Sequence, residues 1–270
     1  MTTTAPTTPV LMLHHVEPGP LTPPPLYPDS YLTTADFARF LDDLQHRGFA
    51  TATLAEAAAH AAMGRPLPKK TVVLTFDDGC RCFAEHALPE LRQRGMTATL
   101  FAVSGELGGS NTWDRRPPPT GEPGEREERL LSAEELRAAA AAGVEIGCHS
   151  RTHRDLTTLA DGDLAEETDG ARRDLQTLLG RPVVTFCYPY GRLDGRVRAA
   201  VEAAGYLAAV AIHGQPGARP GDPFALPRMI LNPGESRFER RLKAGGLYPL
   251  WSRLPRLGLL AALRGGKGGR

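Results

Sequence analysis

Short apolar, often β-branched runs alternate along the chain with longer segments whose apolar residues recur at a helical period. The runs that favour strands are 10–16, 49–54, 72–76, 97–103, 144–148, 182–186, 206–212 and 224–231. The segments that favour helices are 35–47, 55–63, 83–94, 133–143, 161–179 and 194–204. Alternating strands and helices predict a parallel α/β architecture. At 270 residues the chain can bury one large core, so we expect a single domain.

Helix boundaries carry their own signals in the sequence. Thr34 is the predicted N-cap of the first helix, and Gly48 is its predicted stop. Ser132 and Glu135 have the spacing of a capping box and predict a helix that runs to Gly143. These signals divide the chain into strand–helix units and show no internal repeat.

One strand run ends in unusual chemistry. The apolar run 72–76 is followed directly by Asp77, Asp78 and Gly79. Neighbouring side chains on a strand face opposite ways, but a glycine turn relaxes that rule, so both carboxylates can reach one pocket. Two adjacent acids at the end of a buried strand are costly unless a metal ion or a proton lies between them.

A second strand run supplies partners for that positive charge. Residues 144–148 are followed by His149 and His153, a His-x-x-x-His pair. Two imidazoles four residues apart can converge on one ion if the loop turns helically. One carboxylate with two histidines is a facial metal triad that leaves positions open for water and substrate. The other carboxylate is then available as a base.

Three segments together resemble a known family. Residues 75–79 (Thr-Phe-Asp-Asp-Gly), 149–153 (His-Ser-Arg-Thr-His) and 186–191 (Phe-Cys-Tyr-Pro-Tyr-Gly) resemble, in order and spacing, three motifs of the polysaccharide deacetylases, carbohydrate esterase family 4. The resemblance covers about residues 9 to 232. It implies a distorted (β/α) barrel, usually of seven parallel strands, with its active site at the C-terminal ends of the strands.

The resemblance also implies roles for particular residues. Asp78, His149 and His153 are the expected metal ligands, and Asp77 is the expected general base. The backbone N–H of Tyr190 is expected to help stabilise the oxyanion. Zn²⁺ suits these ligands best, but the same triad also suits Co²⁺, Ni²⁺ or Fe²⁺.

The position of the general acid in this sequence differs from the commonest pattern of the family. Many relatives place it in a C-terminal Leu-x-His motif, which residues 211–213 (Ala-Ile-His) match only in part. One branch of the family places it instead in a tyrosine–histidine pair on the first strand. Residues 11–16 resemble that segment, with Leu13 in place of the tyrosine, and this points to His14 as the acid. His213 is the second candidate.

The positively charged residue expected to pair with the base also differs in position from the usual family pattern. Cys187 stands where the family often has an arginine that pairs with the base aspartate. Residues 226–228 (Leu-Pro-Arg) resemble a segment of the same N-terminal-acid branch, so Arg228 is the candidate for that charge role, although a surface arginine is the competing interpretation.

Two further features allow more than one interpretation. Trp113 lies in the long pattern break 105–129 and is expected to stack on a sugar, although it could simply pin the loop. Cys80 and Cys82 follow the acid pair and could bind a metal, but small thiols at such a position more often fill the core. All four cysteines are expected to be reduced thiols.

The net charge and the two ends of the chain indicate which kinds of partner and which location to expect. The formal net charge is +1, which gives no field that would favour nucleic acid. Residues 1–8 are expected to be disordered, and the barrel is expected to span 9–235. We see no signal-like start and no membrane-length apolar run, and we expect a cytoplasmic protein. Residues 236–270 form a basic amphipathic extension that either packs on the barrel or contacts anionic lipid or a lipid-linked substrate.

The sequence therefore predicts a metal-dependent N-deacetylase that releases acetate from an N-acetylated amino sugar. Two alternatives remain open at this level: a deformylase or another amidase acting on a small or lipid-linked glycoside, and a non-catalytic carbohydrate-binding relative. The intact set Asp77, Asp78, His149 and His153 argues against the last. An Fe(II) oxygenase could use the same triad, but the adjacent second carboxylate disfavours it.

Overall fold

A computed structural model of the chain describes residues 8–19, 28–114 and 128–251. Several expectations fall outside this part of the chain. They are the disordered start apart from residue 8, the middle of the break 105–129, and the basic tail beyond Trp251.

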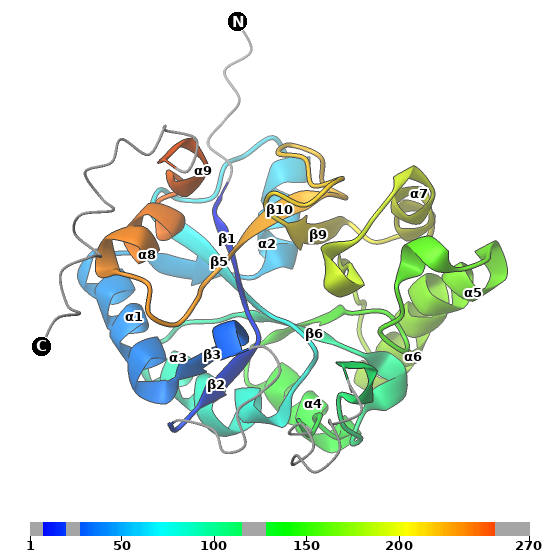
Figure 1. Ribbon diagram of the computed structural model, residues 1–270, viewed down its shortest axis with the longest axis horizontal. Helices are drawn as coiled ribbons and strands as arrows, with labels where there is room; N and C mark the ends of the chain where they lie inside the picture. Colours follow the sequence, from blue (N-terminus) through cyan, green and yellow to red (C-terminus); the bar gives the residue numbers. More distant parts are fainter. Residues whose placement is uncertain (1–7, 20–27, 115–127, 252–270) are drawn as a thin grey trace, which may run out of the picture.

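Seven parallel strands close into a barrel, as predicted (Figure 1). They are hydrogen-bonded in the order β1-β10-β9-β8-β7-β6-β5, and β5 pairs with β1 to close the ring. The strands are β1 (Val10–Leu13), β5 (Thr71–Phe76), β6 (Thr99–Ala102), β7 (Glu145–Cys148), β8 (Thr185–Cys187), β9 (Ala208–Ile212) and β10 (Leu226–Ile230). The short strand β4 (Ala50–Ala52) pairs with the first half of β5.

Strand β5 is buried along its whole length. Its register with β1 runs from Val10 opposite Val73 to Leu13 opposite Phe76. Barrel strands are covered by helices outside and filled by side chains inside, which is why this run is continuously apolar rather than alternating. Because β5 lies within the closed sheet, its C-terminal end and the following residue, Asp77, lie at the mouth of the barrel.

Helices surround the strands (Figure 1). The helices of the described part are α1 (Thr34–His46), α2 (Leu54–Ala62), α3 (Leu88–Gln93), α4 (Ala133–Ala141), α5 (Asp161–Ala165), α6 (Ala171–Leu179), α7 (Gly195–Ala203), α8 (Arg237–Ala244) and α9 (Tyr248–Trp251). The predicted helix 83–94 begins as a π-helical turn over Phe83–Ala87, and the predicted helix 161–179 is interrupted by another at Glu166–Gly170.

The cap of α1 corrects one prediction. Thr33, not Thr34, is the N-cap, because its hydroxyl accepts the backbone N–H of Asp36 while its own backbone is still extended. Two adjacent threonines both fit the sequence signal, and only the backbone conformation separates them. The capping box at Ser132 and Glu135 is present as predicted.

Helix α2 contacts both β5 and β9, and its first backbone N–H groups are bound inside the fold. The N–H of Leu54 donates to the hydroxyl of Thr99, and that of Ala55 donates to the carboxylate of Glu145. These acceptors lie at the N-terminal ends of β6 and β7, so α2 covers the end of the barrel opposite the candidate site.

The predicted first strand divides at His14. Residues 10–13 form β1 in the barrel, whereas β2 (His15–Glu17) leaves it and pairs with β3 (Tyr31–Thr33). The break places His14 and His15 in different surroundings.

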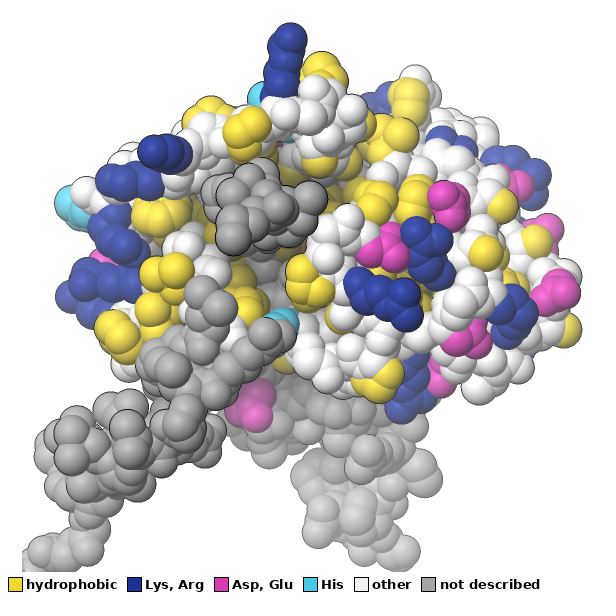
Figure 2. Space-filling model, turned by 90° about the horizontal axis from the view of Figure 1, so that it is seen from above, with side chains coloured by type: hydrophobic (Ala, Val, Ile, Leu, Met, Phe, Trp, Pro, Cys, Tyr) yellow, Lys and Arg dark blue, Asp and Glu magenta, His cyan; other side chains and the backbone are white. Residues whose placement is uncertain are grey.

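Helix α8 packs against α1 and β1, which favours the packing interpretation for the start of the basic extension. Arg240 and Lys243 are buried, and Lys243 donates to the carbonyl of Ile230 and pairs with Glu235. On the face in Figure 2, Lys and Arg lie next to Asp and Glu on the right, whereas Lys and Arg predominate on the left. Among the helices of the described ranges, none combines the length and apolar character needed to cross a bilayer.

Candidate active site

The predicted site residues gather at the C-terminal ends of the barrel strands. Asp77 and Asp78 follow β5, His14 follows β1, and His149 and His153 follow β7. Arg228 reaches the same place from within β10. Parallel strands all end at the same rim of a barrel, which brings together residues that are far apart in the sequence.

Asp78, His149 and His153 form a compact buried cluster. The Oδ1 atom of Asp78 lies 3.4 Å from Nε2 of His149 and 3.5 Å from Nε2 of His153. One donor atom from each residue lies within 4.8 Å of the others, and each side chain is at most 7% exposed. Two imidazole nitrogens and one carboxylate oxygen are a donor set that suits a divalent transition-metal ion.

The orientation of both imidazoles fits metal binding. Nδ1 of His149 lies 2.9 Å from the carbonyl oxygen of Cys187, so it must carry the proton and leave the Nε2 lone pair for an ion. His153 is held between two rings, with Trp113 stacked at 4.6 Å and Tyr190 edge-on at 4.7 Å between centroids. The His pair thus has a fixed geometry.

The backbone around the cluster is unusual. Asp78, Ser150, His153 and Tyr190 have φ values of 71°, 63°, 58° and 58°, all in the left-handed region. This conformation costs free energy for residues other than glycine and is found most often at functional sites. It turns the Asp78 side chain out of strand alternation, so that it faces the histidines beside Asp77.

Asp77 is paired with Arg228 inside the protein. Nη1 and Nη2 of Arg228 donate to the two carboxylate oxygens at 2.6 and 2.8 Å. The arginine side chain is 1% exposed, and it also donates to the hydroxyl of Thr75 and the sulfur of Cys187. The competing interpretation of Arg228 as a surface residue is therefore wrong, because β10 carries it into the barrel interior.

The pKa shifts follow from these charges. Burial raises the pKa of Asp77, but the charge and hydrogen bonds of Arg228 outweigh burial and hold it below its usual range. For Asp78 burial is likewise outweighed, here by the neighbouring imidazoles of His149 and His153, so its pKa also lies below its usual range. Burial and the charge of His149 lower the pKa of His153 to about 3. The carboxylates of Asp77 and Asp78 thus stay ionised, and the imidazole of His153 stays neutral.

Of the two candidate acids, His14 lies nearer the base. Its Nε2 is 3.9 Å from Oδ2 of Asp77, and its side chain is 24% exposed. Burial lowers its pKa, and the charges of Asp77 and Asp78 oppose that effect. His213 follows β9, where its backbone N–H donates to the carbonyl of Arg228. Geometry favours His14.

Glu167 is a site residue that the sequence did not reveal. Its carboxylate is buried and accepts the backbone N–H groups of Arg151 and Thr152 and the hydroxyl of Thr152. It therefore fixes the loop between His149 and His153. A glutamate within a helical segment normally lies at the surface, so no local signal marks it.

A closed parallel barrel with this acid pair and histidine pair at its rim has the architecture of the barrel deacetylases. Residues 64–209 match the polysaccharide deacetylase family model. That match covers more than half of the chain, and the chain belongs to this family.

Individual relatives agree with this assignment. The chain is 25% identical over 230 residues to YxkH of Bacillus subtilis (strain 168), which is named as a polysaccharide deacetylase; the match covers 84% of this chain and 72% of YxkH. Among solved structures, the fold resembles the Streptococcus pyogenes deacetylase PplD, with a TM-score of 0.71, 18% identity and coverage of 92% and 98% of the two chains. It also resembles IcaB from Ammonifex degensii, with a TM-score of 0.66, 24% identity and coverage of 89% and 97%.

Proposed function

We propose that the protein is a metal-dependent N-deacetylase that hydrolyses an N-acetyl amide on an amino sugar and releases acetate. The observation that carries this proposal is the buried cluster of Asp78, His149 and His153, with Asp77 next to it and paired to Arg228. Family membership supports a deacetylase, and the donor set supports a metal ion.

Asp78, His149 and His153 would hold the ion. Zn²⁺ fits best, and Co²⁺, Ni²⁺ or Fe²⁺ remain alternatives. When bound, the ion would polarise the amide carbonyl and lower the pKa of water. Hydrogen bonding of His149 to the Cys187 carbonyl and the rings around His153 would keep both imidazoles aimed at one point.

Asp77 would act as the general base. Its carboxylate is ionised, and Arg228 fixes its orientation, so it can accept a proton from the attacking water. His14 would act as the general acid and protonate the leaving nitrogen, since its Nε2 lies 3.9 Å from Oδ2 of Asp77 and its side chain is 24% exposed. The backbone N–H of Tyr190, in the turn Pro189–Gly191, would help hold the oxyanion.

The substrate would be an N-acetylated carbohydrate, and nucleic acid is not an expected partner. Trp113 remains the candidate for sugar contact, although in this structure one face of its ring stacks on His153. The matched relative chitin deacetylase 1 of Cryptococcus neoformans is 26% identical over 126 residues, which are 47% of this chain and 22% of that protein. Its name makes chitin oligomers a sensible first substrate class.

Acetate release tests the proposal. Metal-loaded and chelator-treated protein would be incubated with chitooligosaccharides, a β-1,6-linked glucosamine polymer that is N-acetylated, and single N-acetyl sugars. Release by the metal-loaded form alone is the expected result, and Asp77→Asn should abolish it. No acetate from any substrate at full metal occupancy would overturn the proposal, and formate release from N-formyl analogues would then identify a deformylase.

Three further expectations remain proposals. The domain limits 9–235 and 236–270 can be tested by limited proteolysis. A cytoplasmic location can be tested by cell fractionation. Contact of the extension with anionic lipid can be tested by vesicle sedimentation, although its residues beyond Trp251 lie outside the described part.

A further inference from the structure

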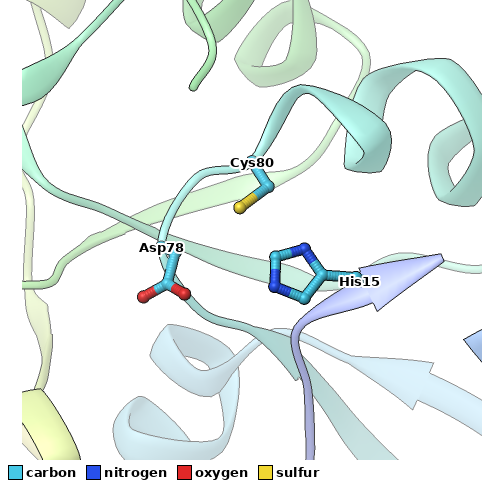
Figure 3. Close-up of side chains that lie close together, drawn as sticks. All are labelled: His15, Asp78 and Cys80. Carbon is cyan, nitrogen blue, oxygen red and sulfur yellow. The ribbon is translucent and has the colours of Figure 1, made fainter. Parts of the chain in front are cut away.

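A second cluster of potential ligands lies beside the first. His15, Asp78 and Cys80 each offer a donor atom, and these atoms lie within 4.8 Å of one another. Figure 3 shows the imidazole, the carboxylate and the thiol close together, with His15 at the start of β2 and with Asp78 and Cys80 on the turn after β5. The proposed deacetylase site uses neither His15 nor Cys80, so the proposed function does not explain why these two side chains lie together beside Asp78.

Cys82 is a further thiol next to this cluster. Its sulfur lies 3.7 Å from Nδ1 of His15, and its side chain shares a small buried cluster with that of Cys80. The Cys-x-Cys segment begins two residues after Asp78, with Gly79 between them, so one short stretch of chain carries Asp78 and both thiols. One sulfur, one imidazole nitrogen and one carboxylate oxygen are a donor set that suits Zn²⁺ and other thiophilic ions, and the thiol of Cys82 lies near enough to His15 to be a further candidate.

The side chains of the cluster are buried and held in place by their neighbours. His15, Asp78, Cys80 and Cys82 are 4%, 6%, 1% and 5% exposed. The ring of Tyr31 stacks flat on His15, with centroids 4.1 Å apart and 11° between planes, and its hydroxyl donates to buried Glu128. An aromatic ring that fixes an imidazole in this way acts as an outer support of the kind that orients metal ligands.

We propose that His15, Asp78 and Cys80 form a second metal site that takes a thiophilic divalent cation such as Zn²⁺, with the neighbouring thiol of Cys82 as its candidate fourth ligand. Asp78 has two oxygens, and Oδ1 faces His149 and His153. Its carboxylate can therefore bridge the two sites. The thiols release their protons to solvent on binding, since the thiolate is the ligand. The ion would link β2, the turn after β5 and the start of the helical segment at Cys82.

Co²⁺ alone is the probe, because thiolate ligands give it a charge-transfer band in the near ultraviolet that nitrogen and oxygen ligands do not. The full chain, reduced and freed of metal with a chelator, would be titrated while absorbance is recorded. We expect two bound Co²⁺ ions per chain and a thiolate band. The proposed ligands of the first site include no sulfur, but the thiol of Cys187 lies close to His149 and Asp77, so the variants below must show which thiols give the band.

Three variants separate the sites. Cys80→Ser/Cys82→Ser should lose the band and keep one ion, whereas His149→Ala/His153→Ala should keep the band and lose one ion. Cys148→Ser is the matched control, since that buried thiol contacts the carbonyl of Ser150 and lies outside the cluster; it should behave as wild type. Circular dichroism would check that each variant is folded.

Absence of a thiolate band from folded wild-type protein would overturn the proposal, whatever the variants do. A band that persists unchanged in Cys80→Ser/Cys82→Ser would also overturn it. Either result leaves the deacetylase proposal standing, because acetate release depends on the other ligand set. Loss of acetate release with the thiolate band intact would instead count against the proposed function.

Discussion

Replacing Arg228 by methionine is a direct test of how the candidate site is held together. Arg228 and Asp77 are 1% and 4% exposed, and two short hydrogen bonds join them. Methionine has a similar length but no charge, so Arg228→Met would leave the Asp77 carboxylate buried without its main partner. Removing one member of a buried ion pair typically costs about 3–5 kcal/mol of folding free energy.

The cost should depend on pH in a defined direction. In the wild type the pKa of Asp77 is depressed, so its stabilising effect is present above its unfolded-state pKa and is lost as pH falls through the folded-state value. Without Arg228, burial would raise that pKa, and ionisation would then oppose folding as pH rises. The stability difference between wild type and Arg228→Met should therefore be larger at about pH 7 than at about pH 4.5.

Urea denaturation of metal-free protein at both pH values measures this difference. Arg198→Met is the matched control, because Arg198 makes a similar two-bond contact to Asp222, at 2.8 Å twice, but its side chain is 31% exposed. It should lose only about 0–1 kcal/mol. Equal losses for the two variants, or a loss at Arg228 that does not change with pH, would refute the reasoning.

Three other substitutions test separate parts of the structure. Glu167→Gln should weaken metal binding about 10–100-fold, measured by competition with a chromophoric chelator, because the loop between the two histidine ligands loses its charged anchor; unchanged affinity would count against that role. His14→Gln should lower kcat about 10²–10⁴-fold with little change in bound metal, as expected for an acid and not a ligand; a metal-free variant would contradict it. Gly147→Ala should cost about 1–3 kcal/mol in denaturant unfolding, because the new methyl carbon would lie 2.5 Å from the Phe101 ring inside the barrel; a wild-type midpoint would show that the ring can move.

The alternation of short apolar runs with helical segments was sufficient to predict a parallel α/β architecture, and the resemblance of three motifs to a known family was needed to predict a barrel. The sequence was also sufficient to name Asp78, His149 and His153 as neighbours, since all follow strands that end at one rim. Even Arg228, 151 positions from its partner Asp77, could be predicted through a local motif resemblance.

Other features depend on geometry that no local pattern encodes. Which of Thr33 and Thr34 caps α1 is decided by one backbone torsion. The break of the first strand at His14, which separates it from His15, arises because β2 pairs with β3 outside the barrel. Glu167 looks like any surface glutamate of a helix until the fold brings a loop against it.

The closure of the barrel by β1 has a consequence for how the chain is made. The first strand of the sequence lies between β5 and β10, so one of its neighbours is synthesised only when residues 226–230 leave the ribosome. Until then the growing chain has an open strand edge and a negative charge at Asp77 without its partner, because Arg228 arrives on that same last strand. The nascent protein therefore exposes an edge that can pair wrongly throughout most of its translation, and completion of the barrel and of its buried ion pair is a single late event.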